Sequence, residues 1–157
     1  MMVEVGGHDL KREGYFQVDV IGSPDMVADI RVLPFKHSLD GIYASHVFEH
    51  LEDADIVLAM KSCRAAIKPE GILEVYVPDL LWFMRKFLKA PPGERWGLYG
   101  PMIFGGSSVQ EAQHRTGFSV KRLQMCLVAA GFRKVEAKRV KRESRFGIME
   151  IHGIAVV

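Results

Sequence analysis

The sequence predicts an α/β fold built on one mostly parallel sheet. From residue 39 onward, strand-like segments alternate with segments of helical periodicity, as in sheets with helical crossovers. Two strand-like segments at the C-terminus are separated only by a short basic turn, which predicts an antiparallel hairpin with one antiparallel strand at an edge. The chain has 157 residues and 48% hydrophobic content, which favours a single domain over residues 1–157.

The N-terminal part predicts four short strands. The segment between the first two is too short for the crossover of about a dozen residues that a parallel pair normally needs. Any helix in that connection must therefore be reduced. The four predicted strands cover residues 3–5, 15–20, 26–32 and 39–45.

Helices enter in the middle of the chain. Residues 53–67 carry apolar side chains at helical spacing, with Asp53 as the expected N-cap. A strand follows over 71–77, and Asp79 then begins a second helix that ends before Pro91. Residues 93–117 show little periodicity, so we expect an irregular segment. Its aromatic residues Trp96, Tyr99 and Phe104 are expected to cover apolar sheet and to form a lid or a subunit contact.

The C-terminal part predicts a helix and the hairpin. Ser119 is the expected N-cap of a helix whose C′ residue is Gly131. The two strands cover 132–140 and 147–157. Basic residues gather between 133 and 145; we interpret them as a solvated hairpin edge, so a nucleic-acid partner is not expected.

Composition indicates a cytoplasmic protein without a membrane segment. The net charge is +2, and the two cysteines, Cys63 and Cys126, both fall in helical patterns that favour packing over disulfide formation. No apolar run approaches the ~20 residues of a membrane span, and no secretory signal is visible.

The densest chemistry lies at the end of the fourth predicted strand. Ser45, His46, Glu49 and His50 fall within six residues, where ligands of open α/β sheets bind. His46-Val-Phe-Glu-His50 also matches the His-x-x-Glu-His pattern of inverted zinc peptidases. A zinc site needs a third ligand on a downstream helix and none stands out, so we assign no metal ligands.

Several motifs occur together in an order found in one enzyme family. They are Gly14-Tyr-Phe-Gln-Val-Asp19, Asp29-Ile-Arg-Val-Leu-Pro-Phe35, His46-Val-Phe-Glu-His-Leu51 and Lys68-Pro-Glu-Gly71. The chain resembles the class I S-adenosylmethionine-dependent methyltransferases, in particular small predicted methyltransferases with a His-Val-x-Glu-His-Leu motif. This resemblance implies a Rossmann-like three-layer sandwich with a seven-stranded sheet, a C-terminal antiparallel hairpin and reduced N-terminal helices.

The resemblance also implies a cofactor site for S-adenosyl-L-methionine, with S-adenosyl-L-homocysteine as its product. Asp19 would accept both ribose hydroxyls, Asp29 the adenine amino group, and Leu33 and Phe35 would provide an apolar wall. The remaining implied cofactor contacts are Gly6, Ile30, Ser45 and His46.

The implied activity is methyl transfer to a small-molecule acceptor. His46 is the first candidate for a general base and His114 the second, because imidazole titrates near neutral pH. Arg115 is a candidate anion clamp for the substrate.

One departure from the family pattern supports an alternative. The first loop of the family is Gly-x-Gly, whereas here it is Gly6-Gly7-His8. A side chain at the second glycine position could fill cofactor space, or a shifted loop could accommodate both the side chain and the cofactor. The alternative is a catalytically inactive methyltransferase-fold domain that binds a partner, with a homodimer through residues 92–117 as one form.

Overall fold

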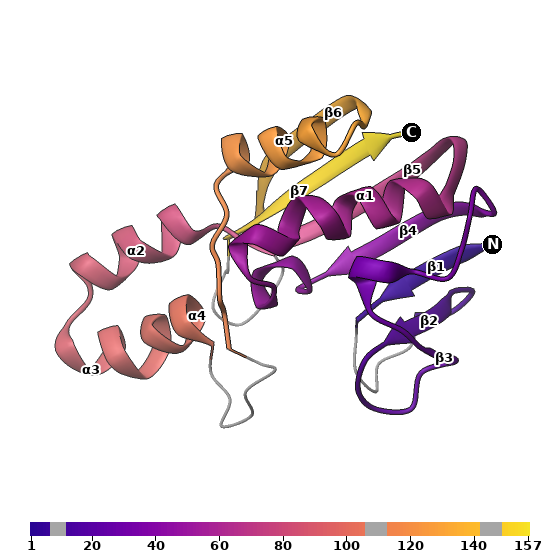
Figure 1. Cartoon of the computed structure of the whole chain (residues 1–157). Helices are drawn as coiled ribbons and strands as arrows, with labels where there is room; N and C mark the ends of the chain where they lie inside the picture. Colours follow the sequence, from indigo (N-terminus) through magenta and orange to yellow (C-terminus); the bar gives the residue numbers. More distant parts are fainter. Residues whose placement is uncertain (7–11, 106–112, 142–148) are drawn as a thin grey trace.

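The computed structural model describes residues 1–6, 12–105, 113–141 and 149–157. Seven strands form one sheet in the order β3-β2-β1-β4-β5-β7-β6 (Figure 1). The strands are β1 (Met2–Val5), β2 (Phe16–Asp19), β3 (Met26–Val27), β4 (Leu39–Ser45), β5 (Ile67–Pro78), β6 (Arg133–Lys141) and β7 (Met149–Val156). The α-helices are α1 (Ile56–Ala66), α2 (Leu80–Lys89), α3 (Pro92–Glu94), α4 (Gly100–Phe104) and α5 (Val120–Ala129).

The strand pairing confirms the predicted mostly parallel, seven-stranded sheet with its C-terminal antiparallel hairpin. β1, β2, β3, β4 and β5 pair in parallel, whereas β7 is antiparallel to both β5 and β6. The sequence predicted the antiparallel strand at an edge of the sheet, and this position is wrong. The antiparallel strand, β7, lies between β5 and β6, and β6 is the edge strand.

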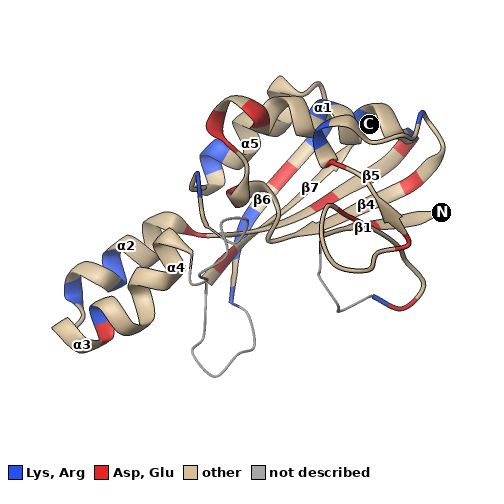
Figure 2. Ribbon diagram, turned by 60° about the horizontal axis from the view of Figure 1, so that its bottom comes forward, with Lys and Arg blue, Asp and Glu red and all other residues tan. Residues whose placement is uncertain are grey.

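Helices cover one face of the sheet. α1 and α5 lie together on the same side in Figures 1 and 2, and the side chains beneath them are fully buried. The opposite face carries no helix in the described part of the chain. It presents a half-buried row in which Tyr43 lies 5.6 Å from Tyr76, and Tyr76 stacks on His152 at 4.4 Å between ring centroids.

Two predicted boundaries are wrong near the pocket end of the sheet. The predicted strand 26–32 stops after Val27, because the Asp29 side chain accepts from the Arg31 amide and begins a 3₁₀ turn, η1 (Ile30–Val32). The helix predicted from Asp53 begins at Ile56, after the 3₁₀ turn η3 (Asp53–Asp55). The Asp53 carboxylate instead accepts from the Thr116 hydroxyl at 2.6 Å.

The segment predicted as irregular after Pro91 is helical up to residue 104. α3, the π-helical turn η4 (Arg95–Tyr99) and α4 fold back on α2, and we call residues 80–104 the helical arm (Figure 1). The Arg95 side chain donates to the carbonyls of Phe87 at 3.0 Å and Ala90 at 3.1 Å, so it caps the end of α2. These contacts stabilise helices in a segment whose sequence shows little helical periodicity.

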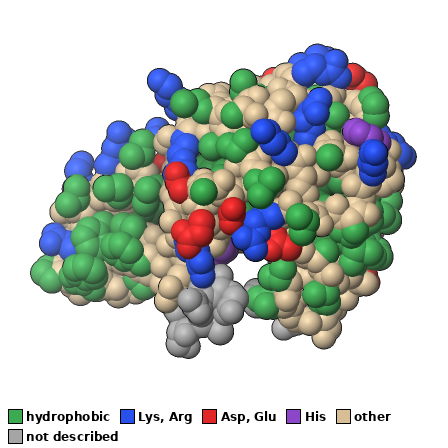
Figure 3. Space-filling view, in the orientation of Figure 1, with side chains coloured by type: hydrophobic (Ala, Val, Ile, Leu, Met, Phe, Trp, Pro, Cys, Tyr) green, Lys and Arg blue, Asp and Glu red, His purple; other side chains and the backbone are tan. Residues whose placement is uncertain are grey.

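The surface of the helical arm is rich in apolar side chains, which gather over its part of the molecule in Figure 3. Leu88 is 71% exposed, Trp96 64% and Phe104 60%. Within the described ranges, no helix is long and apolar enough to cross a lipid bilayer.

Candidate active site

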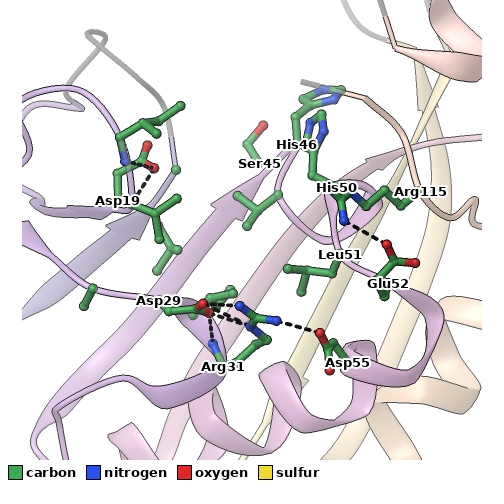
Figure 4. Close-up of a pocket in the computed structure, with 17 residues that line it drawn as sticks. Asp19, Asp29, Arg31, Ser45, His46, His50, Leu51, Glu52, Asp55 and Arg115 are labelled. Carbon is green, nitrogen blue, oxygen red and sulfur yellow. Dashed lines mark hydrogen bonds and ion pairs between the residues drawn. The ribbon is translucent and has the colours of Figure 1, made fainter. Parts of the chain in front are cut away.

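One pocket of about 630 Å³ lies where the carboxyl ends of β1, β2 and β4 meet. The volume is in the range of small-molecule sites, about 300–1,000 Å³. Figure 4 shows polar side chains from several elements around this hollow. Among its lining residues are seven predicted site residues: Gly6, Asp19, Asp29, Ile30, Ser45, His46 and Arg115.

Gly6 lets the backbone turn sharply at the end of β1. Its φ is +77°, and its amide donates to the Val18 carbonyl at 3.0 Å. A Cβ at this position would lie 2.5 Å from Cγ2 of Val47. Glycine is therefore required both by the backbone conformation and by the space at the pocket wall. His8, in the adjoining loop, lies outside the described residues.

Asp19 ends β2 with one carboxylate oxygen engaged. Oδ1 accepts from the amides of Val20 at 2.7 Å and Ile21 at 3.3 Å, which fixes the turn after the strand. Oδ2 makes no hydrogen bond to the described residues. The side chain is largely buried, at 8% exposure, and lines the pocket. A ligand hydroxyl could therefore use the second oxygen without disturbing the turn.

Within the described residues, Asp29, unlike Asp19, forms an ion pair with an arginine. Arg31 donates to it through Nε at 3.0 Å and Nη2 at 2.6 Å, and also reaches Asp55 at 2.7 Å through Nη1. The hydrogen bonds from Arg31 lower the pKa of Asp29 despite its partial burial. Both Asp29 oxygens are thus already bound, unlike those of Asp19.

The apolar wall of the pocket differs from the one implied by the resemblance. Leu33 and Phe35 do not line the pocket but pack with the hydrophobic core. The 3₁₀ turn η1 carries Leu33 inward, where its amide donates to the Ser62 hydroxyl at 2.9 Å. The apolar lining comes from Val5, Val20, Ile21, Ala28, Ile30, Val47 and Leu51.

His46 is held between two buried carboxylates. Its Nδ1 lies 2.9 Å from Oε1 of Glu49, and its Nε2 lies 2.9 Å from Oε1 of Glu150. Burial lowers the pKa of His46, but the hydrogen bonds and charges of Glu150 and Glu49 outweigh it and raise the pKa to about 9. Both ring nitrogens then carry protons and donate.

The backbone of His46 is also unusual. Its φ is +56°, a conformation that few side chains adopt, and its amide donates to the Tyr76 carbonyl at 2.9 Å. The residue therefore turns the chain out of β4 into the 3₁₀ turn η2 (Phe48–His50).

His50 and Arg115 line the pocket at the end beyond Ser45 and His46, which we call its mouth (Figure 4). Arg115 donates from Nη1 to Glu52 at 2.8 Å, and its amide donates to the Glu49 carbonyl at 2.8 Å. His114 does not line the pocket but packs on His50, with 5.1 Å between ring centroids.

Two participants were missed by sequence reasoning. Glu150 comes from β7, 104 positions after His46, and no local pattern connects the two. Arg31 could have been found, because it lies two residues after Asp29 on the same short turn.

Comparisons with known proteins agree with this architecture. Residues 2–75 match the family described as "Methyltransferase domain". No curated protein matches the sequence.

Among solved structures, the chain is similar to a 1,6-didemethyltoxoflavin-N1-methyltransferase of Burkholderia thailandensis, solved with S-adenosylhomocysteine and 1,6-didemethyltoxoflavin. The identity is 16% and the TM-score 0.65, over 99% of this chain and 70% of the other. A SAM-dependent methyltransferase of Methanosarcina mazei gives 14% identity and a TM-score of 0.67, over 99% and 91% of the two chains. A Haloferax volcanii protein solved in complex with the Trm112 methyltransferase activator gives 13% identity and a TM-score of 0.62, over 99% of this chain and 81% of the other.

At these identities the likeness concerns the fold. Together with the family match of residues 2–75, it identifies the chain as a protein of the class I S-adenosylmethionine-dependent methyltransferase fold.

Proposed function

We propose that this protein binds S-adenosyl-L-methionine in the pocket and transfers its methyl group to a small-molecule acceptor. The observation that carries the proposal is the combination of Gly6 and Asp19 at adjacent strand ends. Gly6 turns the backbone at the pocket wall with a φ of +77°, and Asp19 offers a carboxylate oxygen to the pocket. Solved relatives of the same fold contain S-adenosylhomocysteine.

The cofactor would lie across the ends of the strands. Its ribose hydroxyls would donate to Asp19, and its adenine would lie over η1, beside Ile30 and Asp29. The methionine end would pass Gly6 towards Ser45 and His46 at the end of β4. This orientation points the methyl group towards the mouth, where Arg115 could hold an anionic acceptor.

Methyl transfer from a sulfonium needs alignment more than covalent assistance. A hydroxyl or amine acceptor also needs a proton acceptor. His46 suits this role poorly because both of its ring nitrogens donate to carboxylates. Its positive charge instead holds Glu49 and Glu150 together below the pocket. His114, the second predicted base, is not bound in this way to any described carboxylate, and burial lowers its pKa. It packs on His50 and does not line the pocket, so it would act only on an acceptor that reaches past His50.

Calorimetric titration with S-adenosylhomocysteine tests the proposal. We expect binding of one equivalent by the purified protein, and the proposal fails if millimolar ligand produces no heat. A His8→Gly variant adds a second comparison. If that variant binds and the natural protein does not, the inactive alternative is correct.

The inactive alternative has one structural observation in its favour, the apolar helical arm. Leu88, Trp96 and Phe104 would be covered in a homodimer. Light scattering of the full chain tests this form: a dimer that dissociates in a Trp96→Glu variant supports the contact. A cytoplasmic location is also a proposal, supported by the free cysteines Cys63 and Cys126.

A further inference from the structure

Three potential metal ligands converge behind the mouth of the pocket. Glu49 and His50 come from η2, and His114 comes from the segment that precedes α5. One ligand atom from each of them lies within 4.8 Å of the other two. Local sequence contributes two of these side chains, and the third arrives from 64 residues farther along the chain.

Glu49 has a carboxylate oxygen that lacks a partner among the described residues. The residue is 1% exposed, and Oε1 accepts from His46. Oε2 is buried, and no hydrogen bond from the described part of the chain reaches it. Leaving a buried charged acceptor unsatisfied costs free energy, so such an atom calls for a ligand.

His50 is oriented as a metal ligand would be. Its Nδ1 lies 3.1 Å from the Gln113 carbonyl, which can only accept a hydrogen bond, so Nδ1 carries the proton. Nε2 is then the nitrogen with a free lone pair. Metal-binding histidines commonly donate their other ring nitrogen to a carbonyl in this way.

His114 is also placed to coordinate. Its half-buried ring meets the His50 ring edge-on, with 5.1 Å between ring centroids and 65° between ring planes. A neutral imidazole is a common ligand of transition-metal ions.

The backbone holds the three residues in place before any ion arrives. The Glu49 carbonyl accepts from the amides of Arg115 at 2.8 Å and Thr116 at 3.2 Å. The His114 amide donates to the Phe104 carbonyl at 3.1 Å. The two bonds to Glu49 join η2 to the segment that carries His114, and the third joins that segment to α4, so little ordering is left for an ion to impose.

We propose that Glu49, His50 and His114 form a binding site for a divalent first-row transition-metal ion of the zinc type. Two imidazoles and one carboxylate are the ligand set of many zinc sites that keep a position open. Mg²⁺ and Ca²⁺ prefer oxygen ligands and fit less well. The site differs from the His-x-x-Glu-His pattern, because both nitrogens of His46 are bound to carboxylates and His114 replaces it.

The proposed ion would border the acceptor end of the pocket, because His50 is one of the residues that line it. In the setting of the proposed function, it could lower the pKa of an acceptor hydroxyl. His114 would then be a ligand and would no longer be available as the general base.

Titration of the EDTA-treated protein with Zn²⁺, without cofactor, tests the site. We expect one equivalent to bind by calorimetry, and Co²⁺ to give visible d–d absorption. His50→Ala and His114→Ala should each weaken binding at least tenfold, while circular dichroism shows that both variants remain folded. The matched control is His37→Ala, because His37 is exposed and lies outside the cluster.

Absence of Zn²⁺ binding by the natural protein would overturn the proposal. So would Zn²⁺ affinity that is unchanged in His114→Ala or falls equally in His37→Ala. Because no cofactor is present, the result is separate from S-adenosylhomocysteine binding. If the site is a metal site, methyl transfer should also fall with EDTA and return with Zn²⁺; a base role for His114 predicts no such dependence.

Discussion

Replacing Asp19 by asparagine separates the two tasks of its carboxylate. Asparagine keeps an oxygen that can accept from the amides of Val20 and Ile21, so the turn after β2 should persist. The other oxygen becomes an NH₂ group, which cannot accept from a ribose hydroxyl. Cofactor binding should therefore weaken while the free energy of unfolding stays nearly constant.

The size of the effect follows from the contacts. A hydrogen bond to a charged group contributes about 1.5–3 kcal/mol. Loss of that acceptor should thus cost about 1.5–3 kcal/mol, a roughly 10- to 150-fold rise in Kd. Asp19→Ala should weaken binding similarly but also reduce stability by about 1–2 kcal/mol, since two backbone amides lose their acceptor.

Calorimetry with S-adenosylhomocysteine and urea unfolding measure the two quantities. Asp29→Asn is the matched control, because it removes a carboxylate from the same pocket whose oxygens are already bound by Arg31. We expect that control to lose less than about fivefold, or about 1 kcal/mol. Equal affinities of the natural protein and Asp19→Asn would refute the reasoning, as would Asp19→Asn being as unstable as Asp19→Ala.

Two further changes test the walls of the pocket. Gly6→Ala should lower the free energy of unfolding by about 1–3 kcal/mol more than Gly14→Ala. Both glycines have positive φ, but only the new methyl group at position 6 would meet Val47. Equal losses of unfolding free energy in urea would contradict this reasoning. Arg31→Gln should let the pKa of Asp29, which Arg31 lowers, return towards 3.8, as measured by carboxyl NMR titration. Because this pKa is lowered in the folded state, the stabilisation from the Asp29–Arg31 pair is present above pH 3.8 and disappears on acidification. The unfolding free energies of Arg31→Gln and the natural protein should therefore converge at low pH.

Much of the sheet follows from local sequence. β4 has its predicted bounds, Asp79 and Ser119 cap α2 and α5, and Gly131 has a φ of +92° after α5. Each of these features depends on residues that are neighbours in the chain. Hydrophobic alternation, capping side chains and glycine at a left-handed position are local properties, so sequence alone predicts them.

Side-chain contacts that leave no periodic pattern explain two parts of the fold that were predicted wrongly. The helical arm forms although its periodicity is weak, since Arg95 caps α2 and the ring of Trp96 lies 4.9 Å from that of Phe87. β3 stops early because Asp29 begins a turn that Arg31 then stabilises.

The candidate site divides in the same way. The sequence by itself determined that Gly6, Asp19 and Ser45 gather at one edge, because parallel strands that follow one another end on the same side of a sheet. Only the tertiary structure decided how the histidines are used. Glu150 from β7 takes the second nitrogen of His46, and His114 joins Glu49 and His50. Side-chain protonation and ligation depend on which groups meet in space. Glu150 lies 104 positions from His46, and His114 lies 64 positions from His50, beyond any local pattern.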